Sequence, residues 1–336
     1  MKEMMHYNLL HHNTFGIDCF CDKFVEFSTE EEGEEIARQL KPSDKYLILG
    51  GGSDLLLTGD YHGTVVHSAI TDLTSTPTAG GTLVRVGSGM TWDDVVARAV
   101  ESGWHGAENL SIIPGEVGAS AVQNIGAYGA EVKDLINSVE AVEIGTGRKC
   151  CFSNADCDYS YRQSKFKHEW RNRYLITYVT YRFSNRFEPH LEYGNIRQAL
   201  TEKGIEAPSP MQLREVIIDI RNRKLPDPKV LGNAGSFFMN PIVSREVFDH
   251  LHSLYPEMPH YTIDDSHEKI PAGWMIEQCG WKGKSLGRAG VHDKQALVLV
   301  NRGGAKGYEI VELMHQIQAD VRKRFGIEIH PEVNIV

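Results

Sequence analysis

The feature that most constrains this chain is segment 110–129, LSIIPGEVGASAVQNIGAYG. Half of its residues are Gly, Ala, Pro or Ser, and Glu116 carries its only charge. A segment this small and uncharged makes a poor solvent loop, because exposed loops are usually polar and variable. Two structures suit it: backbone packed directly against a flat buried ligand, or a tight crossing inside a core. In the first, Gln123, Asn124 and Tyr128 would supply hydrogen bonds.

A second glycine-rich stretch follows a short apolar run. Residues 46–49 predict a buried strand, which leads directly into GGGSD at residues 50–54. Bare backbone amides at the end of a strand can converge on an anion, as in many phosphate sites. A strand-to-strand turn is the alternative. No G-x-G-x-x-G opens a helix here, so the stretch is not the dinucleotide-binding fingerprint.

A third stretch, residues 224–241, reads KLPDPKVLGNAGSFFMNP. Its prolines predict a rigid, non-helical entry. Glycines on both sides of Asn233 would let the backbone approach a ligand, while Phe237 and Phe238 would fix the loop to a core. A Gly-Asn turn between two strands is the alternative. The later run GWKGKS is not a P-loop, because position 278 is Gln where that motif needs Gly.

Composition limits the function classes. A length of 336 residues favours two or three domains. The formal net charge of −10 argues against a general nucleic-acid binder, because no basic field attracts phosphate. The six cysteines lack zinc or disulfide spacing and are interpreted as reduced cytosolic thiols. We also expect no bound metal, no signal peptide, no membrane insertion and no obligate protein partner.

Local patterns predict several elements. Thr29 with Glu32, and Ser209 with Gln212, have the spacing of capping boxes at helix starts. Alternating apolar residues predict strands at 138–144 and 174–183, and an amphipathic pattern predicts a helix at 310–325, stopped by Gly326. Residues 327–336 are expected to form a strand interrupted by His-Pro-Glu, and Tyr261 is expected in a loop.

Residues 159–167 form a basic, aromatic stretch in an otherwise acidic chain. Basic surface residues are usually only solvated. Arg162, flanked by tyrosine and serine, is nevertheless of the type that forks onto a carboxylate.

Together these segments resemble the UDP-N-acetylenolpyruvoylglucosamine reductase family, collinear from residues 13–18 to residues 331–333. The resemblance implies an α+β fold of three domains, two of them forming a vanillyl-alcohol-oxidase (PCMH)-type FAD-binding unit. The first lobe would comprise residues 1–70 with 326–336, and the second residues 71–220, with the PCMH-type unit at about 17–186. Residues 221–325 would form an α+β substrate-binding domain, and the last strand would return to the first domain.

The resemblance also implies roles for residues. Arg162, Ser236 and Glu332 match the catalytic set, with Ser236 as proton donor and the other two stabilising the enol intermediate. FAD would be held by Gly50, Gly51, Gly52, Ser53, Asp54, Pro114, Gly115, Gly118, Ala119, Gln123, Asn124, Gly126, Ala127, Tyr128 and Gly129. The UDP-sugar would be held by Tyr193, Lys224, Asn240, Tyr261 and Gln295. The loop 192–195 resembles the subtype that closes Tyr193 over the substrate diphosphate.

The implied enzyme is UDP-N-acetylmuramate dehydrogenase, an oxidoreductase acting on a CH–CH group. It would use non-covalent FAD, with NADPH as reductant and an enolpyruvyl UDP-sugar as substrate. It would act in the cytoplasm, in peptidoglycan synthesis, and so serve cell wall biogenesis, cell shape, cell division and the cell cycle. Two alternatives are an alcohol oxidase of the same fold and a catalytically silent flavin- or nucleotide-sugar-binding protein. Three positions depart from the family pattern: Asp54 for Asn, Met239 for Lys and Asn334 for Arg.

Overall fold

The structure, a computed structural model, describes residues 1–41 and 43–336. The chain divides into two compact units. The first unit comprises Met1–Tyr7, Cys21–Gly51 and His62–Arg223, and the second comprises Asn8–Phe20, Gly52–Tyr61 and Lys224–Val336. The break after Arg223 lies close to the predicted start of the substrate domain at 221. The division into three domains stays a prediction.

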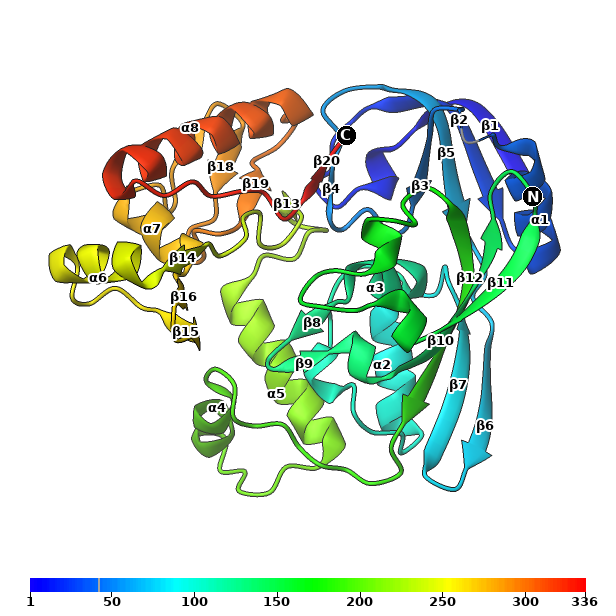
Figure 1. The fold of residues 1–336 in the computed structure, drawn as a ribbon, viewed down its shortest axis with the longest axis horizontal. Helices are drawn as coiled ribbons and strands as arrows, with labels where there is room; N and C mark the ends of the chain where they lie inside the picture. Colours follow the sequence, from blue (N-terminus) through cyan, green and yellow to red (C-terminus); the bar gives the residue numbers. More distant parts are fainter. Residues whose placement is uncertain (42) are drawn as a thin grey trace. The chain divides into compact units, whose positions relative to one another are not determined.

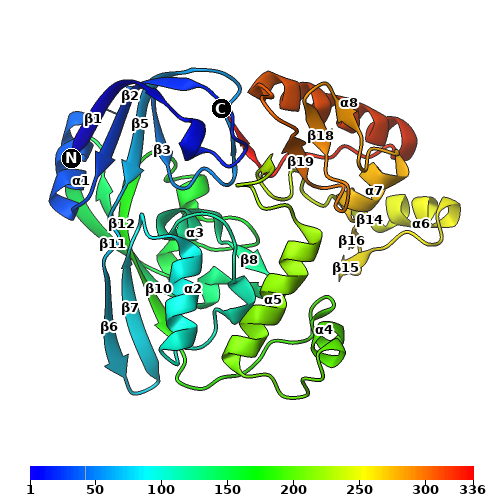
Figure 2. The same ribbon diagram turned by 180° about the vertical axis from the view of Figure 1, so that it is seen from behind.

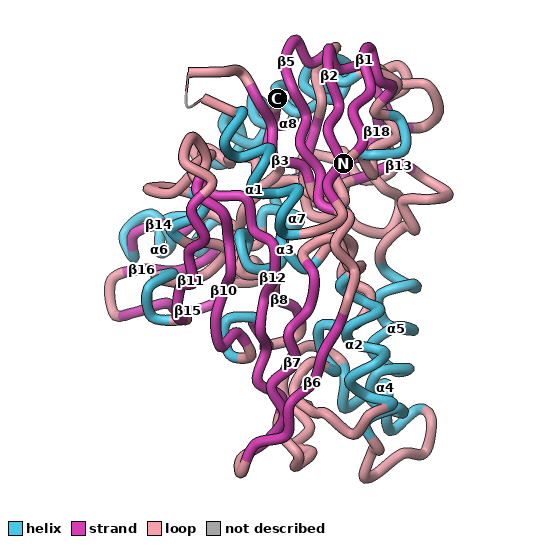
Figure 3. Tube along the Cα trace, turned by 90° about the vertical axis from the view of Figure 1, so that its right-hand side faces the viewer, coloured by secondary structure: helices cyan, strands magenta, loops and turns pink. Residues whose placement is uncertain are grey.

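The first unit is built on two sheets (Figure 1). The smaller has the order β1-β2-β5-β3, formed by Lys2–Asn8, Phe20–Phe27, Tyr61–Ser68 and Tyr46–Leu49. The larger has the order β11-β10-β12-β7-β6, whose strands lie side by side in Figure 3, formed by Arg148–Ser153, Ile136–Glu143, Tyr174–Phe183, Gly81–Gly87 and Leu73–Thr78. A short hairpin pairs β8 (Gly126–Ala127) with β9 (Ala130–Glu131).

The central strands of the larger sheet, β10 and β12, are buried on both faces. On one face, Val179 and Tyr181 of β12 join a core with α2 (Trp92–Glu101) and α3 (Val117–Gln123), which Figure 2 shows beside this sheet. On the other face, Leu175 and Tyr178 of β12 pack with α1 (Glu30–Gln39) and the smaller sheet. A register shift between Glu140 and Ala141 lets β12 keep apolar residues on both faces. A strand buried on both sides explains the nearly continuous apolar run at 174–183.

Helix α5 (Pro210–Lys224) closes the first unit, together with α4 (Ile196–Glu202). Its stripe of Leu213, Val216, Ile217 and Ile220 packs on α4. The capping box is reciprocal, since Gln212 N donates to Ser209 Oγ at 3.2 Å and Ser209 N donates to Gln212 Oε1 at 2.9 Å. The short 3-10 helices of the chain are Leu10–His12, Glu108–Leu110, Val132–Asp134, Ala155–Cys157 and Lys165–Lys167.

The second unit contains smaller sheets and three helices. One sheet has the order β13-β19-β18-β17, formed by Gly232–Asn233, Leu299–Asn301, Ala289–Val291 and Ser285–Leu286. Helix α8 (Gly307–Phe325) packs on β18 and β19, and α7 (Ala272–Gln278) on α8. A second sheet, β14-β16-β15, is formed by Ile242–Ser244, His267–Lys269 and Tyr261–Asp264, beside α6 (Arg245–Leu254). Finally, β20 (Asn334–Ile335) pairs in parallel with β4 (Leu55–Leu56).

Most predicted elements are confirmed, with two corrections. The strand at 174–183, the helix stop at Gly326 with φ of 68° and the Thr29 cap are observed. Tyr261 begins β15 rather than lying in a loop, because main-chain pairing with β16 overrides the nearby prolines. Of residues 327–336 only Asn334–Ile335 is strand. Among the helices in the described part of the chain, none has the length and apolar character needed to cross a membrane.

Candidate active site

The two glycine-rich stretches of the first unit touch backbone to backbone. A Cβ placed on Gly51 would lie 3.2 Å from the Cα of Gly115, and one on Gly50 would lie 3.1 Å from the Cβ of Ala119. A side chain at either position would push the stretches apart, so glycine is what lets them lie together. We call this contact the glycine cradle. The other three residues of the stretch 50–54, which are Gly52, Ser53 and Asp54, belong to the second unit.

The second stretch is held in place by its own backbone. The amides of Val117 and Gly118 donate to the carbonyls of Met90 and Ser88 at 2.9 and 2.8 Å. A Cβ on Gly118 would lie 3.0 Å from the Cβ of Ser88. The segment therefore contains a short helix, α3, packed tightly on the sheet, which the sequence analysis did not predict.

Arg162 lies against this stretch. Its guanidinium donates to the carbonyls of Gly126 at 2.6 Å and Asn124 at 3.3 Å. The side-chain amide of Asn124, fully buried, donates to Glu131 and to the carbonyl of Ser160. The backbone of Arg162 has φ of 58°, a conformation that costs about 1–3 kcal/mol for a non-glycine residue. Such strain persists where surrounding contacts fix it, commonly at functional sites.

Tyr193 lies beside the same stretch. A Cβ on Gly129 would lie 3.3 Å from the Cβ of Tyr193, whose side chain is 54% exposed. Asn109 is buried and donates to the carbonyls of Tyr128 and His190, both at 2.9 Å. The first unit thus brings Arg162 and Tyr193 to one segment.

Ser236 lies in a loop that Asn233 shapes. The Asn233 amide donates to the carbonyls of Pro226 and Leu231, and its oxygen accepts from Gly235 N at 3.0 Å. Gly235 has φ of 70°, which favours glycine. Directly after Ser236, the buried rings of Phe237 and Phe238 fix the loop to the core, as predicted.

Glu332 lies on a backbone segment that pairs with the residues following Ser236. The amide of Glu332 donates to the carbonyl of Phe237 at 2.8 Å, and the amide of Met239 donates to the carbonyl of His330 at 2.9 Å. Two predicted catalytic residues 96 positions apart (332 − 236) therefore lie on adjacent backbone segments.

Asn240 and Gln295 meet at the start of α7. The side-chain oxygen of Asn240 accepts from Ala272 N at 2.9 Å, and a Cβ on Gly273 would lie 3.2 Å from Gln295 Oε1. Tyr261 lies on β15, in the β14-β16-β15 sheet, and is 54% exposed. Lys224 is the last residue of α5.

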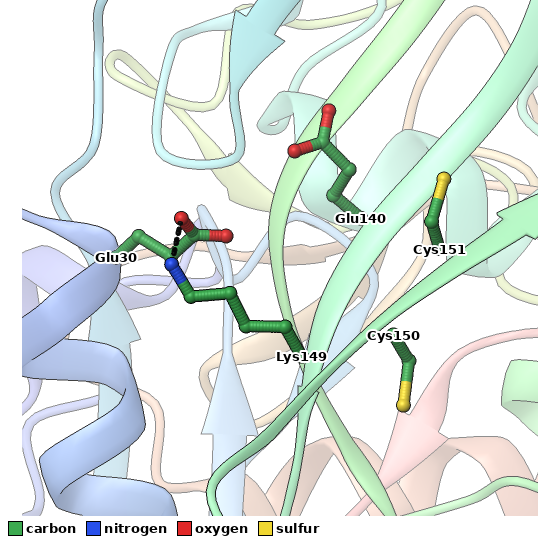
Figure 4. Close-up of a pocket in the computed structure, with 5 residues that line it drawn as sticks. All are labelled: Glu30, Glu140, Lys149, Cys150 and Cys151. Carbon is green, nitrogen blue, oxygen red and sulfur yellow. Dashed lines mark hydrogen bonds and ion pairs between the residues drawn. The ribbon is translucent and has the colours of Figure 1, made fainter.

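A recess on the first unit involves none of the predicted site residues. It has a volume of about 360 Å³ and is lined by Glu30, Glu140, Lys149, Cys150 and Cys151 (Figure 4). Lys149 Nζ lies 2.7 Å from Glu30 and 3.0 Å from Glu34, and these ion pairs tie α1 to β11. The recess is a by-product of that packing.

Comparison with known proteins decides the family. The chain is 54% identical over 332 residues to UDP-N-acetylenolpyruvoylglucosamine reductase of Bacteroides fragilis, covering 98% of this chain and 99% of that protein. It is 46% identical to the Porphyromonas gingivalis enzyme of that name, with 98% of each chain covered. The chain belongs to the UDP-N-acetylenolpyruvoylglucosamine reductase family. Residues 227–336 match the C-terminal domain of this family.

A solved structure and a second domain match support the fold. The UDP-N-acetylenolpyruvylglucosamine reductase of Thermus caldophilus superposes with a TM-score of 0.66 at 19% identity, covering 99% of this chain and 98% of that one. Residues 21–150 match an FAD binding domain. That range contains both stretches of the glycine cradle, whose Cβ-free surface fits a cofactor that the backbone must approach closely. The α+β class and the FAD cofactor are therefore confirmed.

The structure connects two of the three departures from the pattern of the reductase family. Asn334 Nδ2 donates to the carbonyl and to the carboxylate of Asp54, at 3.0 and 3.1 Å. An asparagine amide, shorter than the arginine typical of the family, therefore stands at position 334 and pairs with a carboxylate at position 54. The two departures are thus coupled across β20 and β4. Met239, the third departure, is 38% exposed, and its side chain has no structural explanation.

Sequence reasoning about the reductase family missed Arg221. This guanidinium is buried on α5, and its Nε has no hydrogen-bond partner within residues 1–41 and 43–336. Burial lowers the pKa of Arg221, while Tyr128 and Asp93 oppose that shift. The sequence contained an indication that Arg221 is buried, because Arg221 follows Ile217 by four positions and so continues the apolar stripe of α5.

Proposed function

We propose that this protein reduces the enolpyruvyl ether of UDP-N-acetylglucosamine-enolpyruvate to UDP-N-acetylmuramate, a step of peptidoglycan precursor synthesis. One observation supports the proposal beyond family membership: the backbone amide of Glu332 donates to the carbonyl of Phe237, the residue that follows Ser236. The chemistry that bound FAD supplies is hydride transfer from NADPH to the vinyl carbon of the substrate. The cradle residues Gly50, Gly51, Gly115 and Ala119 would hold this cofactor.

Arg162 would orient and polarise the substrate carboxylate. Negative charge develops on that carboxylate when the alkene accepts hydride, so a fixed cation there stabilises the transition state more than the ground state. The carbonyls of Asn124 and Gly126 accept from the guanidinium and preorganise it. An arginine held in advance has little side-chain entropy to lose when the substrate binds.

Ser236 would then donate its hydroxyl proton to the carbon next to the substrate carboxylate. A serine hydroxyl is a weak acid and needs either a strongly basic acceptor or a relay. Glu332 would serve that relay, or hold the intermediate in position.

The remaining predicted residues would bind the UDP-sugar. Lys224 and Tyr193 suit a diphosphate, with Tyr193 closing over it as the subtype of the family implies. Asn240, Tyr261 and Gln295 would contact the nucleotide-sugar. We also propose a cytoplasmic enzyme that needs no protein partner.

The test is spectroscopic. Purified protein should be yellow, lose its flavin absorbance with NADPH in the absence of oxygen, and recover it when enolpyruvyl-UDP-sugar is added. Recovery with oxygen and an alcohol substrate, but not with the UDP-sugar, would identify an oxidase. Protein that binds flavin or UDP-sugar but shows no bleaching would identify a silent binding protein.

A further inference from the structure

A row of charged groups lies directly behind the glycine cradle. His67 on β5 stands between two carboxylates: its Nδ1 is 3.2 Å from Glu26 Oε2, and its Nε2 is 3.1 Å from Glu116 Oε1. Lys2 on β1 donates to the other oxygen of Glu26 at 2.7 Å. The His67 side chain is 12% exposed and each carboxylate 16%, so these three groups are largely enclosed, whereas the Lys2 side chain is 71% exposed.

The network is connected to both glycine stretches. In the pairing of β3 with β5, His67 is the partner of Leu49, the residue before Gly50. At the far end of the network, Glu116 follows Gly115 directly, and its Oε2 would lie 3.5 Å from a Cβ on Gly50. One oxygen of Glu116 therefore faces His67, and the other faces the first glycine stretch. Figure 3 shows β2 and β5, which carry Glu26 and His67, side by side.

The geometry favours a charged imidazole. Each carboxylate can only accept, so both ring nitrogens must donate, and only the imidazolium carries two N–H groups. A neutral ring would satisfy one carboxylate and turn its lone pair toward the other. Burial by itself would lower the pKa of His67, but the hydrogen bonds and charges of Glu116 and Glu26 outweigh it and raise that pKa above 6.5.

The cations Lys2 and His67 keep the Glu26 carboxylate ionised. Burial raises the pKa of Glu26, yet the bonds from Lys2 and His67 prevail and leave it below its ordinary value. This network links Lys2, Glu26, His67 and Glu116, and Phe24 is an aromatic neighbour of the ring.

We propose that the His67 imidazolium is a positioning residue for FAD, which fixes Glu116 against Gly50 and offsets its negative charge where the cofactor diphosphate binds. The inference rests on the proposed function, because it takes the cradle as the diphosphate site. Without the imidazolium, an uncompensated carboxylate would face an anionic ligand and its own hydrogen bond would be lost. FAD should therefore bind tightly below the ordinary histidine pKa of 6.5 and more weakly as pH rises through the raised pKa.

The experiment measures the dissociation constant of FAD, by the fluorescence of free flavin, from about pH 6 to about pH 9. In the wild-type protein the constant should increase about tenfold across that range, the usual effect of losing one charge-assisted hydrogen bond. His67→Gln, which cannot be protonated, should bind weakly at every pH. Glu116→Gln, which removes the repelling charge, should bind at least as tightly as wild type at high pH and show a flat profile.

His62→Gln is the matched control. His62 lies on the same strand, 77% exposed, and its Nδ1 is 3.3 Å from Asp22 Oδ1. This surface pair is solvated, so the variant should keep the wild-type profile. Thermal unfolding of each apoprotein separates an effect on FAD binding from a general loss of stability.

The result that overturns the inference is an unchanged pH profile in His67→Gln or Glu116→Gln. Should His67→Gln not fold, Glu116→Gln decides alone, since loss of FAD in that variant would contradict a repulsive role for the carboxylate. A wild-type protein that takes up no FAD would overturn the proposed cofactor, and this inference with it. Tight binding that does not change with pH would overturn the inference alone.

Discussion

At the scale of single residues, a substitution of Ser236 should affect only one of the two half-reactions. Its hydroxyl is proposed to act only after hydride has reached the substrate, so Ser236→Ala should leave flavin reduction by NADPH within a few-fold of wild type. Reoxidation by the enolpyruvyl substrate should slow by at least about 100-fold, the lower end of what a placed acid contributes. Stopped-flow absorbance of each half-reaction measures this. Wild-type reoxidation in the variant would remove Ser236 as proton donor.

A second residue, Arg221, tests whether a buried unpaired group is retained for function. A buried charge without full hydrogen bonding costs stability, so Arg221→Met should raise the unfolding temperature of the apoprotein. A gain of about 1 kcal/mol corresponds to roughly 1–2 °C in a protein of this size. Calorimetry of the apoprotein measures the change. A lower unfolding temperature would show that the guanidinium contributes stability through Ile112 and Tyr128.

At the scale of elements, an ion pair joins α5 to α2. Arg214 makes two bonds to Asp93, at 2.7 and 2.9 Å, and only 10% of the Arg214 side chain is exposed. Asp93→Asn leaves this buried charge unpaired and should cost about 3–5 kcal/mol in denaturant unfolding. Burial raises the pKa of Asp93, but Arg214 and the Ile112 amide lower it below 3.8 overall. Its stabilisation is therefore present above pH 3.8 and lost as pH falls through the lowered pKa.

The matched control for that element is Asp219→Asn, which breaks an exposed pair with Lys203 at the outer face of α5. Because solvent screens them, such pairs contribute only about 0–1 kcal/mol to the free energy of unfolding. Equal losses in the two variants would contradict the distinction between a buried and an exposed pair.

At the scale of the whole molecule, the chain end completes the second unit. Thr58 N donates to the Val336 carbonyl at 2.8 Å and Val336 N to the Leu56 carbonyl at 2.9 Å. Deleting residues 334–336 removes these bonds and the Asn334–Asp54 pair, so the free energy of unfolding should fall by about 2–4 kcal/mol, at about 1 kcal/mol per bond. Activity should fall further, because Glu332 lies two positions before the first deleted residue. Unchanged turnover would show that the backbone contacts of residues 330–332 with Phe237, Phe238 and Met239 suffice to position Glu332.

The sequence by itself determined what depends on neighbours along the chain. Capping residues at Thr29 and Ser209 start their helices because the bonds span only three positions. Only the tertiary structure decided which distant residues meet: His67 with Glu26 and Glu116, Asp54 with Asn334, and Glu332 with Phe237. Tyr261 and residues 327–336 differed from expectation for the same reason, since strand pairing needs a partner that local pattern does not reveal. Pairings across the fold depend on register and burial, and these are properties of the folded chain as a whole.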